Sequence, residues 1–175
     1  KYAGFSPCFR KEAGAAGRDT RGLARFHQFN KVEQYVFCTP EQSDEMHEHL
    51  LNNLCDVMAD LELPYRVIAN STGDMGFNKV KMNDVEAWVP SENSYKEVGS
   101  CSSIGTFQAR RTNTRYRENK TNEVKFCATL NNTGIAVPRA LVPFLENHQN
   151  ADGSVNIPEK LQPLMDGRKK IGGKH

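Results

Sequence analysis

The chain has 175 residues, a formal net charge of +2 at pH 7, 38% hydrophobic residues and 25% charged residues. This length suits one domain or part of a larger one, and the composition is ordinary for a globular protein. The small net charge excludes an argument for nucleic-acid or membrane binding from bulk electrostatics. No apolar run approaches the length of a membrane span, so we expect no membrane partner. Five cysteines without a Cys-x-x-Cys pair indicate reduced thiols. We therefore expect a cytoplasmic protein, and the sequence leaves an organellar location open.

The first forty residues predict two strands, over 8–12 and 23–39, joined by a glycine-rich, charged loop. Arg10 and Glu12 are two positions apart, so they share one face of a strand. A guanidinium binds a phosphate through two parallel hydrogen bonds, and a carboxylate accepts a hydrogen bond from an amine such as that of adenine. The alternative is a surface hairpin with a solvated ion pair, which is common and weakly stabilising. Spacing alone leaves both interpretations open.

The segment after Pro40 predicts a long helix that ends before Pro64. Its apolar residues recur every three or four positions and form one stripe, typical of a helix packed on a sheet: Met46, Leu50, Leu51, Leu54, Val57, Met58 and Leu61. Beyond it we expect strands over 65–69, 80–89, 95–101 and 125–130, a loop over 70–78, a turn over 90–93 and a short helix over 107–113. On the strand over 95–101, Glu97 and Gly99 are expected to share a face.

The C-terminal third predicts a polar turn over 131–134, a helix over 135–147 and a short helix over 158–165. Strands joined mostly by hairpins, with helices packed on the sheet, indicate an α+β fold with an antiparallel sheet. We expect one domain over 1–165, followed by a basic, glycine-rich, disordered tail over 166–175. Neither Gly-x-x-x-x-Gly-Lys-Ser/Thr nor Gly-x-Gly-x-x-Gly occurs. A nucleotide would therefore be bound by side chains of the sheet.

Two further clusters carry candidate chemistry. Glu97 and Ser100 offer a carboxylate and a hydroxyl, hard oxygen donors that suit Mg²⁺ beside a phosphate; the alternative is a surface strand with a serine-rich turn. Asn131 and Thr133 precede a helix whose N-terminus favours anions, and Arg139 is placed to bind a terminal phosphate. The alternative for that segment is an ordinary helix cap with a surface arginine.

In their order along the chain, these blocks resemble the seryl-tRNA synthetases, a family of class II aminoacyl-tRNA synthetases. The matching segments are Phe9-Arg10-Lys11-Glu12, 22–33, 97–102, 107–111 and 129–139, and the resemblance extends from about Phe5 to Met165. It implies the antiparallel core of a class II catalytic domain, with motifs 2 and 3 of that family. The family's tRNA-gripping helical arm and its motif 1, which builds the dimer interface, have no counterpart here. We therefore expect the C-terminal part of a catalytic domain that forms a homodimer in the full-length protein.

The resemblance implies that ATP is bound by Arg10, Glu12, Phe26, Phe29, Glu97, Ser100 and Arg139. In this set Arg10 would bind the α-phosphate, Glu12 the adenine amine, and Arg139 the γ-phosphate. Phe29 would stack on the adenine ring, with Phe26 against the nucleotide.

The same resemblance implies that serine is bound by Arg10, Glu33, Asn131 and Thr133, with Glu33 receiving the ammonium group. Glu97 and Ser100 would bind Mg²⁺. Arg18 and Arg21 would contact the acceptor end of tRNA(Ser). The sequence departs from the family at Thr133 and Gly99, where serine is common, and at Asn132, where glycine is common. Because Thr133 keeps a hydroxyl, we expect the serine pocket to survive, narrower by one methyl group.

The implied activity is that of a serine-tRNA ligase, which forms seryl-adenylate from serine and ATP and transfers the seryl group to tRNA(Ser). Arg10 and Arg139 would be the catalytic residues, through charge neutralisation rather than nucleophilic attack. One alternative is a paralogue that loads a carrier protein; such relatives use zinc, and no zinc-like Cys/His/Glu set is evident. Another is an inactive synthetase-like binding or assembly subunit. We expect the isolated chain to be weakly active or inactive.

Overall fold

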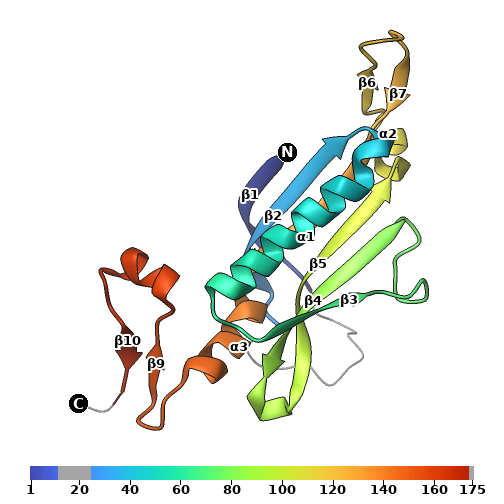
Figure 1. Cartoon of the computed structure of the whole chain (residues 1–175). Helices are drawn as coiled ribbons and strands as arrows, with labels where there is room; N and C mark the ends of the chain where they lie inside the picture. Colours follow the sequence, from blue (N-terminus) through green and yellow to red (C-terminus); the bar gives the residue numbers. More distant parts are fainter. Residues whose placement is uncertain (12–24, 174–175) are drawn as a thin grey trace.

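The computed structural model describes residues 1–11 and 25–173. Within these residues, six strands form one antiparallel sheet in the order β1-β2-β8-β5-β4-β3 (Figure 1). Their bounds are Tyr2–Phe9 for β1, Gln28–Cys38 for β2, Tyr65–Ala69 for β3, Lys81–Val89 for β4, Ser94–Gly105 for β5 and Ala128–Ala136 for β8. The segment over 70–80 joins β3 to β4, and a short connection joins β4 to β5; both pairs of strands are directly hydrogen-bonded. The predicted α+β fold with an antiparallel sheet is confirmed.

A long helix lies along one face of this sheet (Figure 1). A 3₁₀ turn, η1 (Pro40–Gln42), leads into α1 (Ser43–Asp60). The backbone N–H of Thr39 donates to Oε1 of Gln42 (3.2 Å), which satisfies a donor that the helix start would otherwise leave unpaired. The predicted apolar stripe is buried against the sheet and forms the core with residues of four strands: Leu50, Leu51, Leu54, Met58, Val36, Val85, Val98 and Leu130.

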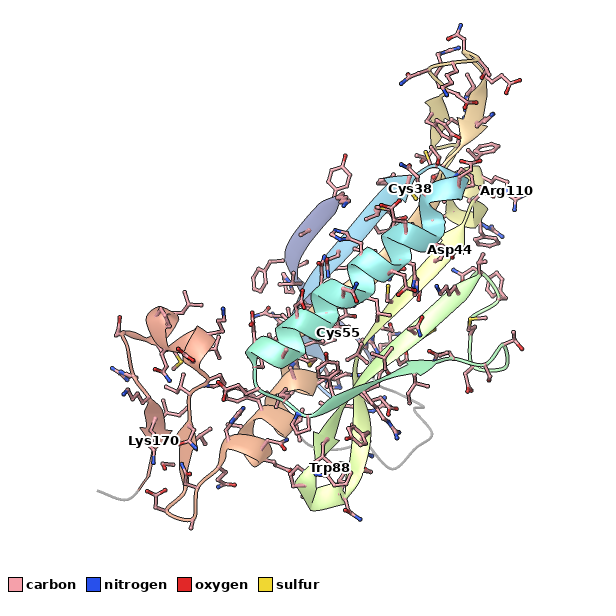
Figure 2. All side chains as sticks on the ribbon, viewed as in Figure 1. Cys38, Asp44, Cys55, Trp88, Arg110 and Lys170 are labelled. Carbon is pink, nitrogen blue, oxygen red and sulfur yellow. The ribbon has the colours of Figure 1, made fainter. Side chains whose placement is uncertain are left out.

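The remaining elements surround the sheet. They are η2 (Pro90–Glu92), α2 (Phe107–Thr112), β6 (Arg115–Arg117), β7 (Val124–Phe126), α3 (Val137–His148), β9 (Ser154–Asn156), η3 (Glu159–Met165) and β10 (Lys170–Gly172). The β6–β7 hairpin projects beyond α2, where Figure 2 labels Arg110. At the opposite end of the sheet, α3 contacts β4, and Nδ2 of Asn147 donates to the carbonyl oxygen of Trp88 (2.9 Å; Trp88 is labelled in Figure 2).

Two β-bulges shift the register of strands that flank one region of the sheet. Between β2 and β8, Glu33 pairs with Thr133 but Val32 pairs with Ile135, so Gly134 is the extra residue. Between β4 and β5, Val85 pairs with Gly99 but Glu86 pairs with Glu97, so Val98 is extra. Because side chains alternate between faces, each bulge changes which residues beyond it face the same way.

Several predicted boundaries of strands and helices are wrong, either because a bulge lies there or because no residue near the boundary marks it. The strand over 8–12 begins earlier, at Tyr2, and its partner begins at Gln28 rather than 23. The polar segment over 131–134 is not a turn: β8 continues through it to Ala136, and α3 begins only at Val137. Asparagine, threonine and glycine suggest a turn, but here they occupy a bulged inner strand.

The pairing of strands contradicts two further expectations. Glu97 and Gly99 lie on opposite faces of β5, because Val98 is the bulge residue between them. The tail is not disordered over Lys170–Gly172, which form β10 and pair with β9. The hairpins β6–β7 and β9–β10 were not predicted from the sequence. In the part of the chain that the structure describes, no helix has the length and apolar character needed to cross a membrane.

Candidate active site

A cavity of about 310 Å³ opens on the side of the sheet away from α1. The orientation follows from β2: Asn53 of α1 donates to Oε1 of Gln34 (2.7 Å), so the odd-numbered residues of β2 point to the other face, among them Phe29 and Lys31, which line the cavity. The cavity is lined by side chains of the sheet, of α3 and of two connecting segments: Arg10, Arg25, Phe26, Phe29, Lys31, Lys79, Met82, Glu97, Val98, Gly99, Ser100, Thr133, Ala136, Pro138 and Arg139.

The charge of this cavity is strongly positive. Among the described residues that line it, five side chains are cationic and one is a carboxylate. The cations are Arg10, Arg25, Lys31, Lys79 and Arg139, and the carboxylate is Glu97. Several arginine and lysine side chains converging on one hollow create a field that attracts anions. Arginine in particular pairs with phosphate and carboxylate through two parallel hydrogen bonds. The cavity therefore suits a ligand with several negative charges.

Arg139 is positioned by the direct junction of β8 and α3. Because α3 begins at Val137 with Pro138 in its first turn, Arg139 stands near the helix start, next to the cavity. Its Nη1 lies 2.7 Å from Oε2 of Glu97, which belongs to β5. A second hollow of about 220 Å³ is also lined by Arg25, Glu97 and Arg139, so the ion pair stands between two open spaces. Both partners remain partly exposed and accessible to a ligand.

The strands β1 and β2 supply the other end of the cavity. Their ladder pairs Cys8 with Phe29, and beyond it the backbone N–H of Arg10 donates to the carbonyl oxygen of His27 (2.9 Å). The guanidinium of Arg10 lies 5.6 Å from the centre of the Phe29 ring. This distance is typical of a cation–π contact, which holds the two side chains together at the cavity wall.

Glu33 is held by two neighbours on the same face. Nδ2 of Asn131 donates to its Oε1 (2.9 Å), and Lys31, two residues before it on β2, forms an ion pair with its Oε2. Glu33 and Asn131 do not line the cavity themselves, but Glu33 pairs across the ladder with Thr133, which does. The carboxylate is therefore fixed beside the cavity by an amide and an ammonium group.

A further carboxylate, Asp84, lies on β4 opposite Ser100 of β5. Burial raises its pKa, and the negative charges of Glu97 and Glu86 act in the same direction. The side-chain amide of Asn70 donates to its Oδ2 (2.7 Å) and lowers the pKa, as does Lys79. Sequence analysis did not single out Asp84, although it alternates with the buried Val85 on a strand next to Ser100.

The chain matches the model of the family described as tRNA synthetase class II core domain (G, H, P, S and T) over residues 1–148. The chain belongs to this family. Its sequence is 56% identical to a serine–tRNA ligase from Deinococcus radiodurans over 173 residues, which is 98% of this chain and 40% of that protein. It is 50% identical over its whole length to a serine–tRNA ligase from Methylobacterium nodulans, again covering 40% of the relative.

Solved structures agree with the synthetase assignment. A seryl-tRNA synthetase from Pyrococcus horikoshii complexed with ATP matches 99% of this chain and 39% of its own, with a TM-score of 0.93 and 47% identity. A cytoplasmic serine–tRNA ligase from Naegleria fowleri in complex with AMP matches with a TM-score of 0.90 and 41% identity, covering 99% of this chain and 41% of its own. This class II core thus spans about two fifths of the length of the relatives it matches. The predicted class II fold is confirmed.

The synthetase core brings most of the predicted site residues together. Seven line the cavity: Arg10, Phe26, Phe29, Glu97, Ser100, Thr133 and Arg139. Glu33 and Asn131 lie directly beside it and contact each other. Glu12, Arg18 and Arg21 fall outside the residues that the structure describes. Their roles, like those of the lining residues, stay predictions.

Among the lining residues that were missed are Arg25, Lys31, Lys79 and Met82. A signal existed for two of them. Lys31 lies two residues from both Phe29 and Glu33, so period-two alternation places it on their face. Arg25 directly precedes Phe26 in the cationic segment between the strands. Lys79 and Met82 come from a loop and from the start of β4, and nothing local distinguishes them from solvated residues.

The donor set of this core fits a magnesium ion. Glu97 and Ser100 both line the cavity, three residues apart on β5. They offer a carboxylate and a hydroxyl, the hard oxygen ligands that Mg²⁺ takes. Within residues 1–11 and 25–173, no group of three His, Cys, Asp or Glu side chains is arranged to hold a metal. Two protein oxygens suffice, since Mg²⁺ in nucleotide sites takes its remaining ligands from phosphates and water.

Proposed function

We propose that this chain provides the catalytic core of a serine–tRNA ligase, which activates serine with ATP and transfers it to tRNA(Ser). The observation that carries the proposal is the cavity itself. Five cationic side chains and an aromatic pair line it, and the Glu33–Asn131 pair lies beside it. The similarity to serine–tRNA ligases, and to synthetase structures in complex with ATP and with AMP, supports the same substrates.

The two ends of the cavity fit the two substrates. Phe29 and Phe26 offer apolar surface for the adenine ring, and Arg10 beside Phe29 is within reach of the α-phosphate. The carboxylate of Glu33 and the hydroxyl of Thr133 offer partners to the ammonium and hydroxyl groups of serine. Arg139 and Arg25 are placed for the distal phosphates, and Glu97 with Ser100 would hold Mg²⁺, which neutralises phosphate charge when bound.

The first step forms a bond between a serine carboxylate oxygen and the α-phosphorus and breaks the bond from that phosphorus to pyrophosphate. Arg10 orients both reacting groups and balances the charge that builds on the α-phosphate oxygens. Arg139 balances the charge that the leaving pyrophosphate gains. In the second step a terminal hydroxyl of tRNA(Ser) attacks the seryl carbonyl carbon, and AMP leaves. We propose that Glu12 binds the adenine amine and that Arg18 and Arg21 contact the tRNA acceptor end.

Serine-dependent exchange of labelled pyrophosphate into ATP by the complete gene product tests this function. We expect exchange with serine, and a loss of about 10²–10³-fold in Arg139→Ala because one charge-stabilising group is removed. Arg168→Ala, an exposed arginine far along the chain from the cavity residues, is the matched control and keeps the wild-type rate. Absence of exchange with every amino acid would contradict both the ligase and the carrier-loading paralogue.

Two broader proposals accompany the activity. We propose that the complete gene product is a homodimer, as the family resemblance implies, and its mass by light scattering decides between one copy and two. We also propose a cytoplasmic location, which the five free thiols support, since such thiols persist in a reducing compartment. Localisation of a tagged protein to an organelle would contradict it.

A further inference from the structure

Gly99 and Thr133 meet at the point where two central strands separate. The ladder between β5 and β8 ends with the pair Cys101–Asn132, and both residues lie just beyond it. Gly99 pairs on its other side with Val85, so a side chain at position 99 would point toward α1. Both Gly99 and Thr133 line the cavity, and Thr133 is only 5% exposed. The contact between them is therefore buried and adjoins the substrate space.

The space above Gly99 is filled by the side chain of Thr133. A Cβ atom built on Gly99 would lie 2.9 Å from Cβ of Thr133, 3.1 Å from its Cγ2 and 3.0 Å from Cδ2 of Leu54. Real Cβ atoms essentially never approach other heavy atoms more closely than 3.0 Å. The end of Leu54 can turn away, but Cβ of Thr133 is bonded to the backbone and moves only with β8. Any side chain at position 99 therefore displaces Thr133.

The backbone of β8 has little freedom to move away. The residue after Thr133 is Gly134, the bulge residue, which packs against β2. A Cβ atom built on Gly134 would lie 3.0 Å from Cγ1 of Val32 and 3.2 Å from its carbonyl oxygen. Thr133 thus stands between two close approaches, one to β5 and one to β2. In a close-packed interior such a contact is relieved by rotating or shifting a side chain, at a cost.

The contact also sets which way Thr133 faces. The two Thr133 atoms nearest to the built Cβ are Cβ and Cγ2, so the methyl group lies nearer to Gly99 than the hydroxyl Oγ1 does. A threonine side chain occupies one of a few staggered positions, so placing its methyl group also places its hydroxyl. The expected narrowing of the pocket by this methyl is offset, because the missing side chain of Gly99 makes room for it.

We propose that Gly99 is a specificity-determining residue of the amino-acid pocket, because it receives the methyl group of Thr133 and so fixes the hydroxyl that contacts the substrate. This inference rests on the proposed serine activation. Gly99 itself is a positioning residue: it acts on the substrate only through Thr133. Residues 99 and 133 form one unit in which a side chain at the first position requires a smaller residue at the second.

Steady-state pyrophosphate exchange by the complete gene product tests this coupling in the variants Gly99→Ala, Thr133→Ser and the double variant. For Gly99→Ala we expect KM for serine to rise about tenfold or more while KM for ATP stays the same, since only the hydroxyl is displaced. The double variant should recover part of this loss, because serine at position 133 removes the methyl contact at 3.1 Å while the Cβ contact at 2.9 Å remains. Gly4→Ala is the matched control, since nothing lies within 4 Å of a Cβ built there.

Two results would overturn the inference: an unchanged KM for serine in Gly99→Ala, or a double variant as impaired as Gly99→Ala. Thr133→Val guards against simple misfolding, because it keeps the methyl group and loses the hydroxyl. It should raise KM for serine while leaving the melting temperature near that of wild type. If wild type shows no serine-dependent exchange, the proposed function fails. The steric coupling is then read from melting temperatures, where the double variant should recover stability lost in Gly99→Ala.

Discussion

The two faces of the sheet are built from the same strands but have opposite chemistry. On β4, Val85 and Ala87 are buried in the core that α1 covers, while Asp84 and Glu86 alternate with them on the other side. The face toward α1 holds the apolar core, and the face with the cavity holds charged and polar groups. Stability and ligand binding are thus divided between the two faces. Substitutions on the face toward α1 should change the free energy of unfolding, and substitutions on the cavity face should change activity.

The largest loss of stability is expected from the core face. Met58 of α1 is 1% exposed, and Met58→Ala removes buried apolar atoms and leaves a cavity. We expect a loss of about 2–5 kcal/mol in the free energy of unfolding, measured by urea denaturation. Leu164→Ala, at a position that is 81% exposed, is the control and should change little. Equal losses in the two variants would break the division between the faces.

The cavity face should respond in activity rather than in stability. Glu33→Gln removes the charge that accepts a hydrogen bond from Asn131 and pairs with Lys31. We expect KM for serine to rise roughly 10- to 100-fold, because hydrogen bonds to charged groups are the stronger ones, with little change in the urea midpoint. The control is Glu123→Gln in the β6–β7 connection, whose side chain is largely exposed. A stability loss like that of Met58→Ala would contradict the comparison.

A titratable group inside the core face gives a pH test. His47 of α1 is fully buried and its Nε2 lies 3.4 Å from the carbonyl oxygen of Cys101. Burial lowers its pKa from the ordinary 6.5, and the charge of Lys81 adds to the effect, whereas Cys101 and Glu48 oppose it. The folded state therefore binds this proton less readily than the unfolded chain. The contribution to stability is present above pH 6.5 and is lost as the pH falls through the lowered pKa.

His47→Gln should flatten the decline in the free energy of unfolding below pH 6.5, measured by denaturation at several pH values. The neighbouring His49 is exposed, so His49→Gln is a control in the same helix and keeps the wild-type profile. A decline of the same slope in His47→Gln would show that other groups cause it.

The smallest effect is expected from an ion pair on the cavity face. Nε of Arg66 on β3 lies 2.7 Å from Oε2 of Glu86, and the guanidinium lies 4.6 Å from the centre of the Tyr95 ring. Arg66 is largely exposed, so solvent screens the pair. Arg66→Ala should cost less than about 1 kcal/mol in the urea-derived free energy of unfolding. A loss comparable to that of Met58→Ala would mean that charged groups on this face also hold the fold together.

The core was predictable because its signal is periodic and local. The stripe of α1 follows from spacing alone and occurs as predicted. The course of β8 was not predictable from the sequence, because a bulge at Gly134 lets polar residues continue a buried strand where composition suggests a turn. The site was predictable as a set of residue types through family resemblance. Lys79 was not predictable, since it belongs to a loop and its place depends on how that loop lies against the sheet, and nothing in the local sequence marks Met82 at the start of β4.

The passage from β8 into α3 without an intervening loop has a consequence for movement within the site. Thr133 and Arg139 belong to one continuous hydrogen-bonded segment, so the proposed amino-acid end and the proposed phosphate end keep a constant separation. A substrate cannot draw these two ends together. Any closure around a bound ligand has to come from the segments that bring Arg25, Phe26 and Lys79 to the cavity. In hydrogen exchange, ligand binding should therefore slow amides near those residues more than the amides of β8, which the sheet already protects.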